Sequence, residues 1–255
     1  MSGEINVVCL KWGVLYGPEY VNTLYAMVQR HLSLPFRFVC FTENPQGLRV
    51  EIDIQPLPDF DEPPWEYARY CSAWRKLALF RPGLANLKGK VLFLDLDLVI
   101  LDSLDDFFTE LEFKASNQVW MQENWYQPGL GQASAMLFEA GGPESLLTRY
   151  ETNPLAVHKV YRTEQEYISE ALGSDCRFFP DGWCLSFKKH VMPQGFRKFL
   201  DRENRQPDAA RILVFHGRPN PPDAIAGHWG KSIAWYKRWL KPIYPTPWLS
   251  RYWRE

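Results

Sequence analysis

Short apolar runs alternate with amphipathic stretches along most of the chain. The apolar runs predict strands at Asn6–Leu10, Phe36–Thr42, Arg49–Ile54, Lys90–Ile100, Val119–Gln122, Ala135–Phe138 and Ile212–Phe215. Helices are predicted at Glu19–Leu32, Glu66–Phe80, Leu104–Leu111, Glu144–Asn153 and Glu164–Leu172. Because strands alternate with helices, we expect an α/β fold with a mixed, mostly parallel sheet and helices on both of its faces.

Two aspartates interrupt the most apolar of these runs. Asp95 and Asp97 follow the apolar residues 91–94, where a buried strand comes to the surface. Side chains alternate along a strand, so both carboxylates are expected on the same face. Two like charges this close repel each other unless a cation lies between them, and Mg²⁺ or Mn²⁺ takes such oxygen ligands. The pattern therefore favours a divalent metal site over a strand end with solvated acids.

Composition narrows the class of protein without choosing a function. The chain has 255 residues, of which 46% are hydrophobic and 23% charged, as in an ordinary globular protein. The net charge of −1 gives no basic field for nucleic acid. Aromatic residues make up 15% and include 11 Trp, which suits sugar binding, a membrane interface or a large core. We expect one domain over residues 1–230 and a tail over 231–255.

Cysteine usage and hydropathy suggest the compartment. The five cysteines are dispersed and contain no C-x-x-C pair, so reduced thiols in a cytoplasmic protein are expected. No apolar run reaches the ~18–20 residues of a membrane helix, and the first residues do not resemble a signal peptide.

Two enzyme families carry an acidic pair of this kind. In haloacid-dehalogenase-like phosphatases the first Asp is a nucleophile and the second a general acid, and 95–99 satisfies the D-x-D-x-[TV] pattern. In GT-A-type glycosyltransferases, D-x-D holds a metal on a nucleotide-sugar diphosphate. About ninety residues precede the pair here, and no later Asp-Asp pair follows at a strand end, which favours the glycosyltransferases.

Over roughly residues 5–225 the chain resembles glycosyltransferase family 8, the glycogenin-like and bacterial lipopolysaccharide galactosyltransferase-like enzymes. The resemblance implies a GT-A-type, Rossmann-like nucleotide-diphospho-sugar transferase fold. It starts with the strand end at Lys11-Trp12, followed by Tyr16 in the next loop, and continues through an Arg-Lys-Leu stretch before the D-x-D strand. The donor-binding residues that the resemblance implies in this half are Lys11, Trp12, Tyr16, Arg69, Arg75, Lys76, Asp95 and Leu96.

The second half of the resemblance departs from the family at several positions. Gln132 and Ser134 stand where the family has an Asn-x-Gly-type strand on the donor sugar, and Glu164-Gln165 stands for an Asp-Gln pair at a helix start. The family ends its fold with His-x-Gly-x-x-Lys-Pro, which resembles the stretch at 216–219. The resemblance makes His216 the third metal ligand beside Asp95 and Asp97, Gly217 a residue for close approach to the diphosphate, and Arg218 its cation.

Together these features predict a metal-dependent glycosyltransferase. Mn²⁺ or Mg²⁺ would bridge the phosphates of a nucleotide diphosphate sugar, with UDP-sugar as the default donor. The acceptor would be a glycan or a lipid-linked sugar, and the resemblance implies retention of configuration, with Glu164 and Gln165 as the catalytic pair. The alternatives are a phosphatase with Asp95 as nucleophile and a non-catalytic carbohydrate-binding protein on a degenerate transferase fold.

The tail combines aromatic and basic residues after Gly227. Trp and Tyr favour the lipid–water interface and cations favour anionic headgroups, so a short interfacial helix at Ser232–Leu240 would allow peripheral contact with the inner face of a membrane. Packing of the aromatic tail back over the domain is the alternative.

Overall fold

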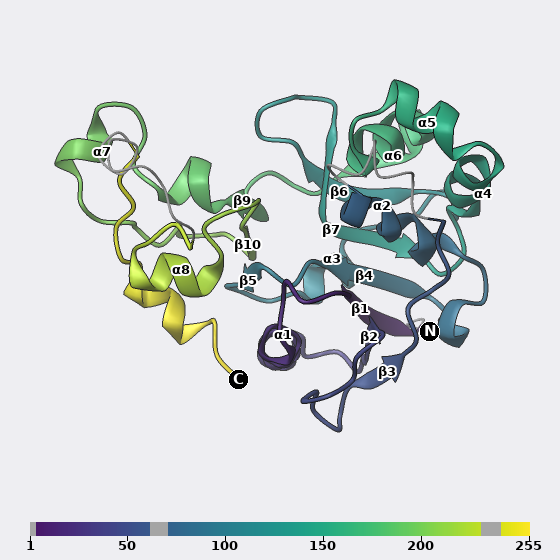
Figure 1. Cartoon of the computed structure of the whole chain (residues 1–255), viewed down its shortest axis with the longest axis horizontal. Helices are drawn as coiled ribbons and strands as arrows, with labels where there is room; N and C mark the ends of the chain where they lie inside the picture. The colour runs from purple at the N-terminus through teal and green to yellow at the C-terminus, as the bar shows by residue number, and fades with distance from the viewer. Residues whose placement is uncertain (1–3, 62–70, 231–240) are drawn as a thin grey trace. The chain divides into compact units, whose positions relative to one another are not determined.

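The computed structural model describes residues 4–61, 71–230 and 241–255, and these residues form two compact units (Figure 1). The first unit comprises Met1–Pro18, Leu34–Asp95 and Asp106–Phe179. The second unit comprises Glu19–Ser33, Leu96–Asp105 and Pro180–Glu255. The chain therefore crosses between the units several times.

The first unit is built on a sheet whose seven described strands are β3 (Asp53–Gln55), β2 (Arg37–Thr42), β1 (Ile5–Lys11), β4 (Lys90–Leu94), β7 (Gly131–Glu139), β6 (Val119–Glu123) and β8 (Cys176–Phe178), in that spatial order. β7 pairs antiparallel with both of its neighbours, and the other pairs are parallel. The predicted mixed, mostly parallel sheet is confirmed. Because β1, β2, β3 and β4 run the same way, their carboxyl ends lie at one edge.

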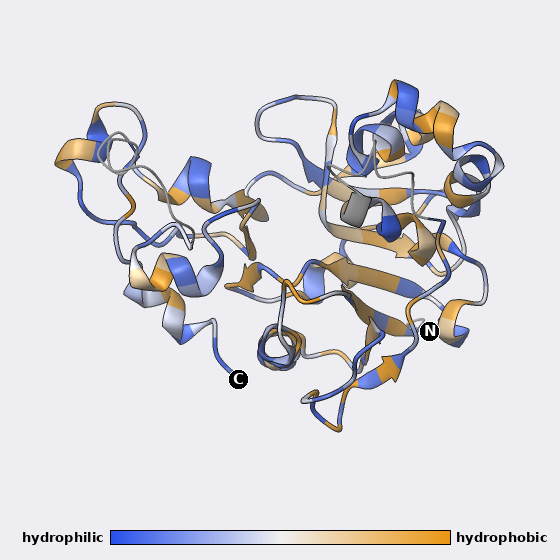
Figure 2. Ribbon diagram, viewed as in Figure 1, coloured by the Kyte–Doolittle hydropathy of each residue, from blue (hydrophilic) through white to orange (hydrophobic). Residues whose placement is uncertain are grey.

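β1, β4 and β7 are buried along nearly their whole length rather than at alternating residues, as expected for strands covered on both faces, and β1 and β4 are mostly apolar (Figure 2). One face packs into a cluster that joins Val8, Val91 and Phe93 of the sheet to aromatic side chains of the helices. Trp74 is central to this cluster and stacks on Tyr150, with ring centroids 5.6 Å apart. The described helices of this unit are α2 (Cys71–Trp74), η2 (Arg75–Phe80), η3 (Leu84–Asn86), α4 (Glu144–Thr152), α5 (Pro154–Val160), α6 (Glu164–Leu172) and η4 (Gly173–Asp175). A further short helix, α3 (Asp105–Thr109), starts at the boundary between the units.

The second unit contains a smaller sheet in which β10 (Ile212–Val214) lies between β5 (Leu98–Ile100) and β9 (Cys184–Ser186). β10 is antiparallel to β5 and parallel to β9. The described helices of this unit are α1 (Pro18–His31, from Glu19 onward), η5 (Phe187–Val191), α7 (Arg197–Leu200), α8 (Pro221–Ala226) and η6 (Pro247–Arg251).

The described part of the tail packs within the second unit. The indole of Trp248 donates to the carbonyl of Asn204 at 2.7 Å, and the rings of Tyr20 and Trp253 meet edge to face at 5.3 Å. Leu249 is fully buried. Residues 241–255 thus follow the packing alternative, and the helix predicted at Ser232–Leu240 falls outside the described residues. Among the helices that the structure describes, none has the length and apolar character needed to cross a bilayer.

Several predicted elements differ from the structure in a physically informative way. The helix predicted from one apolar face, 19–32, is present as α1, but its residues 21–28 are all buried, so it is enclosed on every side. The second predicted helix, Glu66–Phe80, begins outside the described residues and ends as the 3₁₀ helix η2. The short elements α5, β8 and β9 were not predicted, because three to seven residues carry too little periodicity to identify.

The turn before β4 requires a glycine at position 89, and this requirement can be tested by mutation. Gly89 has a φ of +72°, and a Cβ built there would lie 2.3 Å from the carbonyl oxygen of Glu4, which accepts the Lys90 amide. Gly83 has a φ of +71° but nothing within 4 Å of its Cβ position. We expect Gly83→Ala to cost about 1 kcal/mol of unfolding free energy from backbone strain, and Gly89→Ala clearly more. Urea denaturation of both variants measures the difference, and equal losses would contradict the steric account.

Candidate functional site

The acidic pair lies in a turn between two strands and not within one strand. β4 ends at Leu94, the amide of Asp95 donates to the carbonyl of Ser134 at 2.8 Å, and β5 begins at Leu98 in the other sheet. The predicted single strand Lys90–Ile100 is therefore wrong, and so is the argument that strand alternation places the two carboxylates on one face. The run divides because its second half pairs antiparallel with β10 instead of extending the first sheet.

Lys76 binds the first of these aspartates inside the first unit. Its Nζ lies 2.8 Å and 2.9 Å from the two carboxylate oxygens of Asp95, and it also donates to the carbonyl of Ala133 at 2.9 Å. The Lys76 side chain is only 8% exposed, against 23% for Asp95. The ammonium lies 5.2 Å from the centroid of the Phe93 ring. The lysine is thus held by an ion pair, a carbonyl and an aromatic face at the carboxyl end of β4.

Glu164 adds a second, deeply buried carboxylate to this group. Its Oε1 lies 4.0 Å from Lys76 Nζ, and its side chain is 7% exposed. Glu164 is the first residue of α6, whose N-terminus is capped by the side chain of Thr163. Burial raises the pKa of the Glu164 carboxyl above its ordinary value, while the Lys76 ammonium opposes the rise. The structure therefore places one buried cation between Asp95 and Glu164.

Two other predicted residues line the adjoining stretch of β7. The side-chain amide of Gln132 donates to Ser134 Oγ at 2.7 Å and accepts from the Ser134 backbone N–H at 3.0 Å. Both are buried, and they flank Ala133, whose carbonyl binds Lys76. Gln165 is half-buried as the second residue of α6, and its carbonyl accepts from Ser169 Oγ. Lys76 with its carboxylate partners Asp95 and Glu164, together with Gln132 and Ser134 on either side of Ala133, forms a group of residues that we call the Lys76 cluster.

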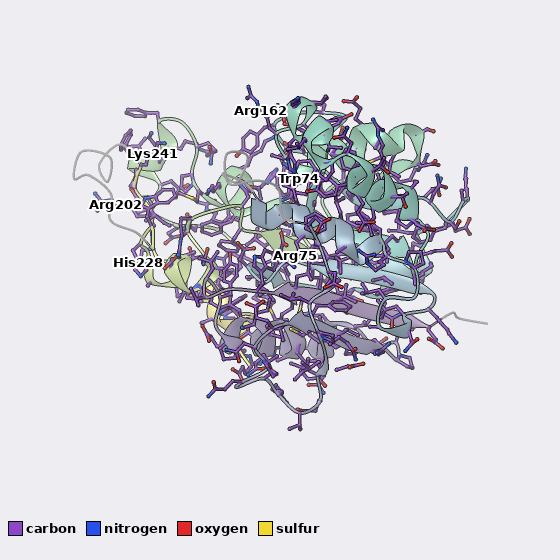
Figure 3. The ribbon with its side chains drawn as sticks, turned by 45° about the vertical axis from the view of Figure 1, so that its right-hand side comes forward. Trp74, Arg75, Arg162, Arg202, His228 and Lys241 are labelled. Atoms are coloured by element: carbon purple, nitrogen blue, oxygen red, sulfur yellow. The ribbon has the colours of Figure 1, made fainter. Side chains whose placement is uncertain are left out.

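The remaining predicted residues near the first strand occupy varied environments. Lys11 is buried at the end of β1, and Trp12 packs against the core of the first unit. Tyr16 is half-buried in the following loop. Arg75, labelled with Trp74 in Figure 3, donates to the carbonyl of Pro58 at 3.4 Å. The side chain of Leu96 is buried, and Arg69 lies outside the described residues.

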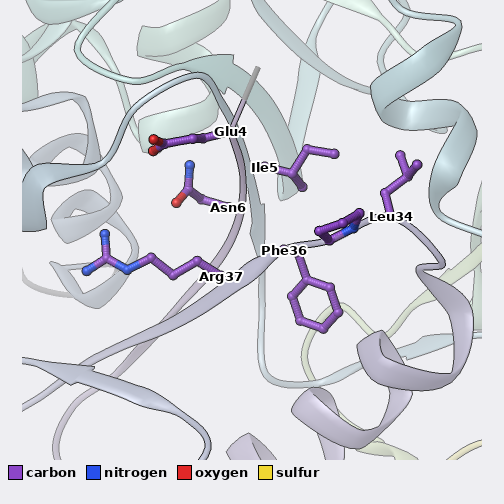
Figure 4. Close-up of a pocket in the computed structure, with 7 residues that line it drawn as sticks. Glu4, Ile5, Asn6, Leu34, Phe36 and Arg37 are labelled. Atoms are coloured by element: carbon purple, nitrogen blue, oxygen red, sulfur yellow. The ribbon is translucent and has the colours of Figure 1, made fainter. Parts of the chain in front are cut away.

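Two pockets in the first unit lie at opposite edges of the sheet. A cavity of about 450 Å³ at the amino ends of β1 and β2 is lined by Glu4, Ile5, Asn6, Leu34, Pro35, Phe36 and Arg37 (Figure 4). A second, of about 380 Å³, is bounded by Phe41 and Gln55 near the carboxyl ends of β2 and β3 and by the loop that follows. Only the second lies at the edge where ligands bind in open α/β sheets.

In the second unit, His216 follows β10 and is held from two sides. Its Nε2 lies 2.6 Å from Ser186 Oγ, and its carbonyl accepts from Lys188 Nζ at 2.6 Å. Burial lowers the pKa of His216 to about 4, and the Lys188 charge adds to the effect. The imidazole is therefore neutral at pH 7, which is the form that binds a metal.

Gly217 and Arg218 complete this turn. Gly217 has a φ of +67°, a backbone conformation that favours glycine. Arg218 Nη1 lies 2.8 Å from Asp223 Oδ2 at the start of α8. The arginine predicted as a diphosphate cation is thus engaged by a carboxylate of its own unit.

Neither Ser186 nor Lys188 belongs to a motif that the sequence displays, and neither is among the predicted site residues. Their relation to His216 depends on the pairing of β9 with β10, which lie about thirty residues apart in the chain. No local pattern in the sequence predicts that β9 pairs with β10.

The predicted metal ligands are divided between the units, with Asp95 in the first and with Asp97 and His216 in the second. Within either unit, the described residues contain no group of three His, Cys, Asp or Glu side chains that could hold a metal ion. The donor chemistry nevertheless suits Mn²⁺ or Mg²⁺, since it combines carboxylate oxygens with a neutral imidazole. Assignment of these three residues to a metal remains a prediction.

Comparison with known proteins identifies the fold. No protein-family model matches the chain, and no curated protein matches it by sequence. Among solved structures, the galactosyltransferase LgtC in complex with donor and acceptor sugar analogues superposes with a TM-score of 0.58 at 12% identity, covering 85% of this chain and 88% of LgtC. The chain has the fold of this glycosyltransferase. The predicted GT-A-type α/β fold and the resemblance on which it was based are confirmed.

Two further structures agree with this result. An active-site mutant of LgtC gives a TM-score of 0.58 at 13% identity, covering 85% of this chain and 89% of that one. GlyE, a glycosyltransferase of Streptococcus pneumoniae, gives a TM-score of 0.55 at 16% identity. The match covers 86% of this chain but only 56% of the GlyE chain, so this chain spans about half the length of GlyE. At these identities the likeness shows the fold alone.

The Lys76 cluster predicts a large effect of removing its cation. Lys76→Met keeps most of the apolar stem but leaves Asp95 and the buried Glu164 without their shared ammonium. Breaking a buried pair costs about 3–5 kcal/mol of unfolding free energy, and the partial exposure of Asp95 places the expected loss near the lower value. Lys159→Met, on an exposed lysine of α5, should change stability by less than about 0.5 kcal/mol. Chemical denaturation compares the two, and similar stabilities would contradict the cluster.

The raised pKa of Glu164 predicts how stability depends on pH. An unfolded Glu has a pKa of about 4.3. As pH rises above that value the unfolded chain loses its proton first, so the wild type loses stability until the higher folded pKa is passed. Glu164→Gln removes this proton. Its stability relative to the wild type should therefore rise between pH 4 and pH 8, measured by urea midpoints across that range. If the stability of Glu164→Gln relative to the wild type stays constant or falls with pH, burial does not dominate the pKa of Glu164.

Proposed function

We propose that this chain is a metal-dependent glycosyltransferase that moves a sugar from a nucleotide diphosphate sugar to a glycan or lipid-linked acceptor. The observation that carries the proposal is the Lys76 cluster, which lies at the carboxyl end of β4 on a glycosyltransferase fold. In open α/β sheets, this end of the strands is where ligands bind. UDP-sugar is the favoured donor.

The cluster supplies a defined set of polar groups for such a donor. Lys76 fixes the orientation of Asp95, so that the carboxylate is held rigid at the strand end. Gln132 and Ser134 form a hydrogen-bonded pair beside it, suited to contacts with sugar hydroxyls. Glu164 and Gln165 start α6 next to this pair, and we assign them to the reacting side of the sugar.

We assign Asp95, Asp97 and His216 to the metal ion, which would be Mn²⁺ or Mg²⁺. When bound, the ion would supply Lewis-acid stabilisation of the leaving nucleoside diphosphate. His216 is suited to the task because its imidazole is neutral at pH 7 and is oriented by Ser186. Lys11, Trp12, Tyr16 and Arg75 are proposed donor contacts that follow β1 or precede the metal-binding turn.

Nucleotide binding tests the proposal. The chain is melted with UDP, GDP, CDP or ADP, each with Mn²⁺ and with EDTA. One diphosphate should stabilise the fold in Mn²⁺ only, by about 2.7 kcal/mol at a hundred times its dissociation constant. The shift should vanish in Asp97→Ala and persist in Asp208→Ala, which removes an exposed acid of the same unit.

Other outcomes would replace the proposal. Absence of any nucleotide-dependent shift in the wild type contradicts it. Hydrolysis of a generic phosphomonoester that is lost in Asp95→Asn would point to phosphatase chemistry. Binding of glycans without metal or nucleotide would point to a carbohydrate-binding protein on a transferase fold.

A further inference from the structure

The carboxyl ends of β9 and β10 bring a lysine next to His216. The two strands are parallel, with Ser186 in register with Val214, so the segments that leave them emerge at the same edge of the small sheet. Lys188 lies in η5, directly after β9, and His216 and Gly217 follow β10 after one intervening residue. Both belong to the second unit, so the arrangement does not depend on the placement of the first.

Lys188 is fixed over the glycine of this turn. Its Nζ donates to the carbonyl of His216 at 2.6 Å, and it lies 3.8 Å from the position that a Cβ would take on Gly217. Apart from the two chain neighbours of Gly217, no other described residue has an atom within 4 Å of that position. An anion that approaches the Gly217 backbone would therefore meet the Lys188 ammonium.

Arg218, the cation expected from the sequence, is engaged elsewhere. Its guanidinium pairs with Asp223, whose side chain is 13% exposed. The same carboxylate oxygen accepts the backbone N–H of Asn220, the N-cap residue of α8. Moving Arg218 onto a phosphate would remove the charge that balances Asp223 in this capping arrangement. Arg218 is thus better explained as part of the helix start.

We propose that Lys188, and not Arg218, is the cation of this unit that binds the diphosphate of the donor. The inference rests on the proposed function and adds a residue that the family pattern does not indicate. A lysine is a compact charge on a flexible stem, which suits a phosphate oxygen. Beside His216 and Gly217, it would neutralise the negative charge that collects on the leaving nucleoside diphosphate.

Calorimetric titration of the full chain with UDP in Mn²⁺ tests the assignment. Lys188→Met should weaken UDP binding about tenfold or more, and Lys188→Arg should restore most of the loss. Lys189→Met removes the same charge from an exposed neighbour and should change the affinity less than twofold. The affinity of the wild type should also fall more steeply with salt than that of Lys188→Met. Melting curves confirm that each variant is folded.

The outcomes separate this inference from the proposed function. UDP binding to the wild type with equal affinity in Lys188→Met leaves the glycosyltransferase assignment in place and overturns the role of Lys188. A larger loss in Arg218→Gln than in Lys188→Met returns the role to Arg218 and also overturns the inference. Absence of binding of UDP, GDP, CDP and ADP to the wild type overturns both.

Discussion

The ion pair of Lys76 with Asp95 joins three segments that are far apart in the chain. Lys76 comes from a 3₁₀ helix, Asp95 from the end of a central strand, and the nearby Glu164 from the start of α6. A charge that is 8% exposed is stable only with close partners, so the ammonium draws these segments to one point. The carbonyl of Ala133 adds the strand that pairs with β4. The relative positions of Lys76, Asp95 and Glu164 depend on these contacts.

The charges of the Lys76 cluster do not balance. One cation faces two carboxylates, and the more buried of them, Glu164, has a raised pKa because burial outweighs the attraction of Lys76. Such a pair of carboxyls in unlike environments is common where proton or charge transfer occurs, but structural ion pairs produce it as well. A bound cation would add the missing positive charge, and a substrate hydroxyl would donate a hydrogen bond to one of the carboxylates. Ligand binding can therefore distinguish a functional role of the two carboxylates from a purely structural one.

In the second unit, a smaller set of polar groups holds the residues that follow β10. His216 is kept neutral by burial and is oriented by the hydroxyl of Ser186, while Lys188 holds its carbonyl. Arg218 is balanced by Asp223 at the start of α8. In both units the polar groups collect where parallel strands end, because there the backbone leaves the ladder and its neighbours can present side chains to a ligand.

The sequence by itself determined the class of fold and the location of the polar strand end. Apolar runs without alternation, separated by helical periodicity, identified β1, β2, β6 and β7 to within a few residues and the start of β4, because burial on both faces leaves a local signature. The interrupted apolar run also singled out Asp95, whereas Lys76, Gln132, Ser134 and Glu164 were singled out through the resemblance and not through spacing. At 12% identity to LgtC, the fold is what the comparison shows the two chains to share.

Only the tertiary structure decided which of these residues touch and how the strands divide. The run at 90–100 is apolar on both sides of its two aspartates, and nothing local shows that its second half pairs with β10, more than a hundred residues later. The partners of Lys76, Arg218 and His216 could not be predicted either, because no local pattern in the sequence indicates them. Side-chain pairing between distant segments depends on strand register and on the burial of charge, and both are set by the assembled chain and not by any short stretch of it.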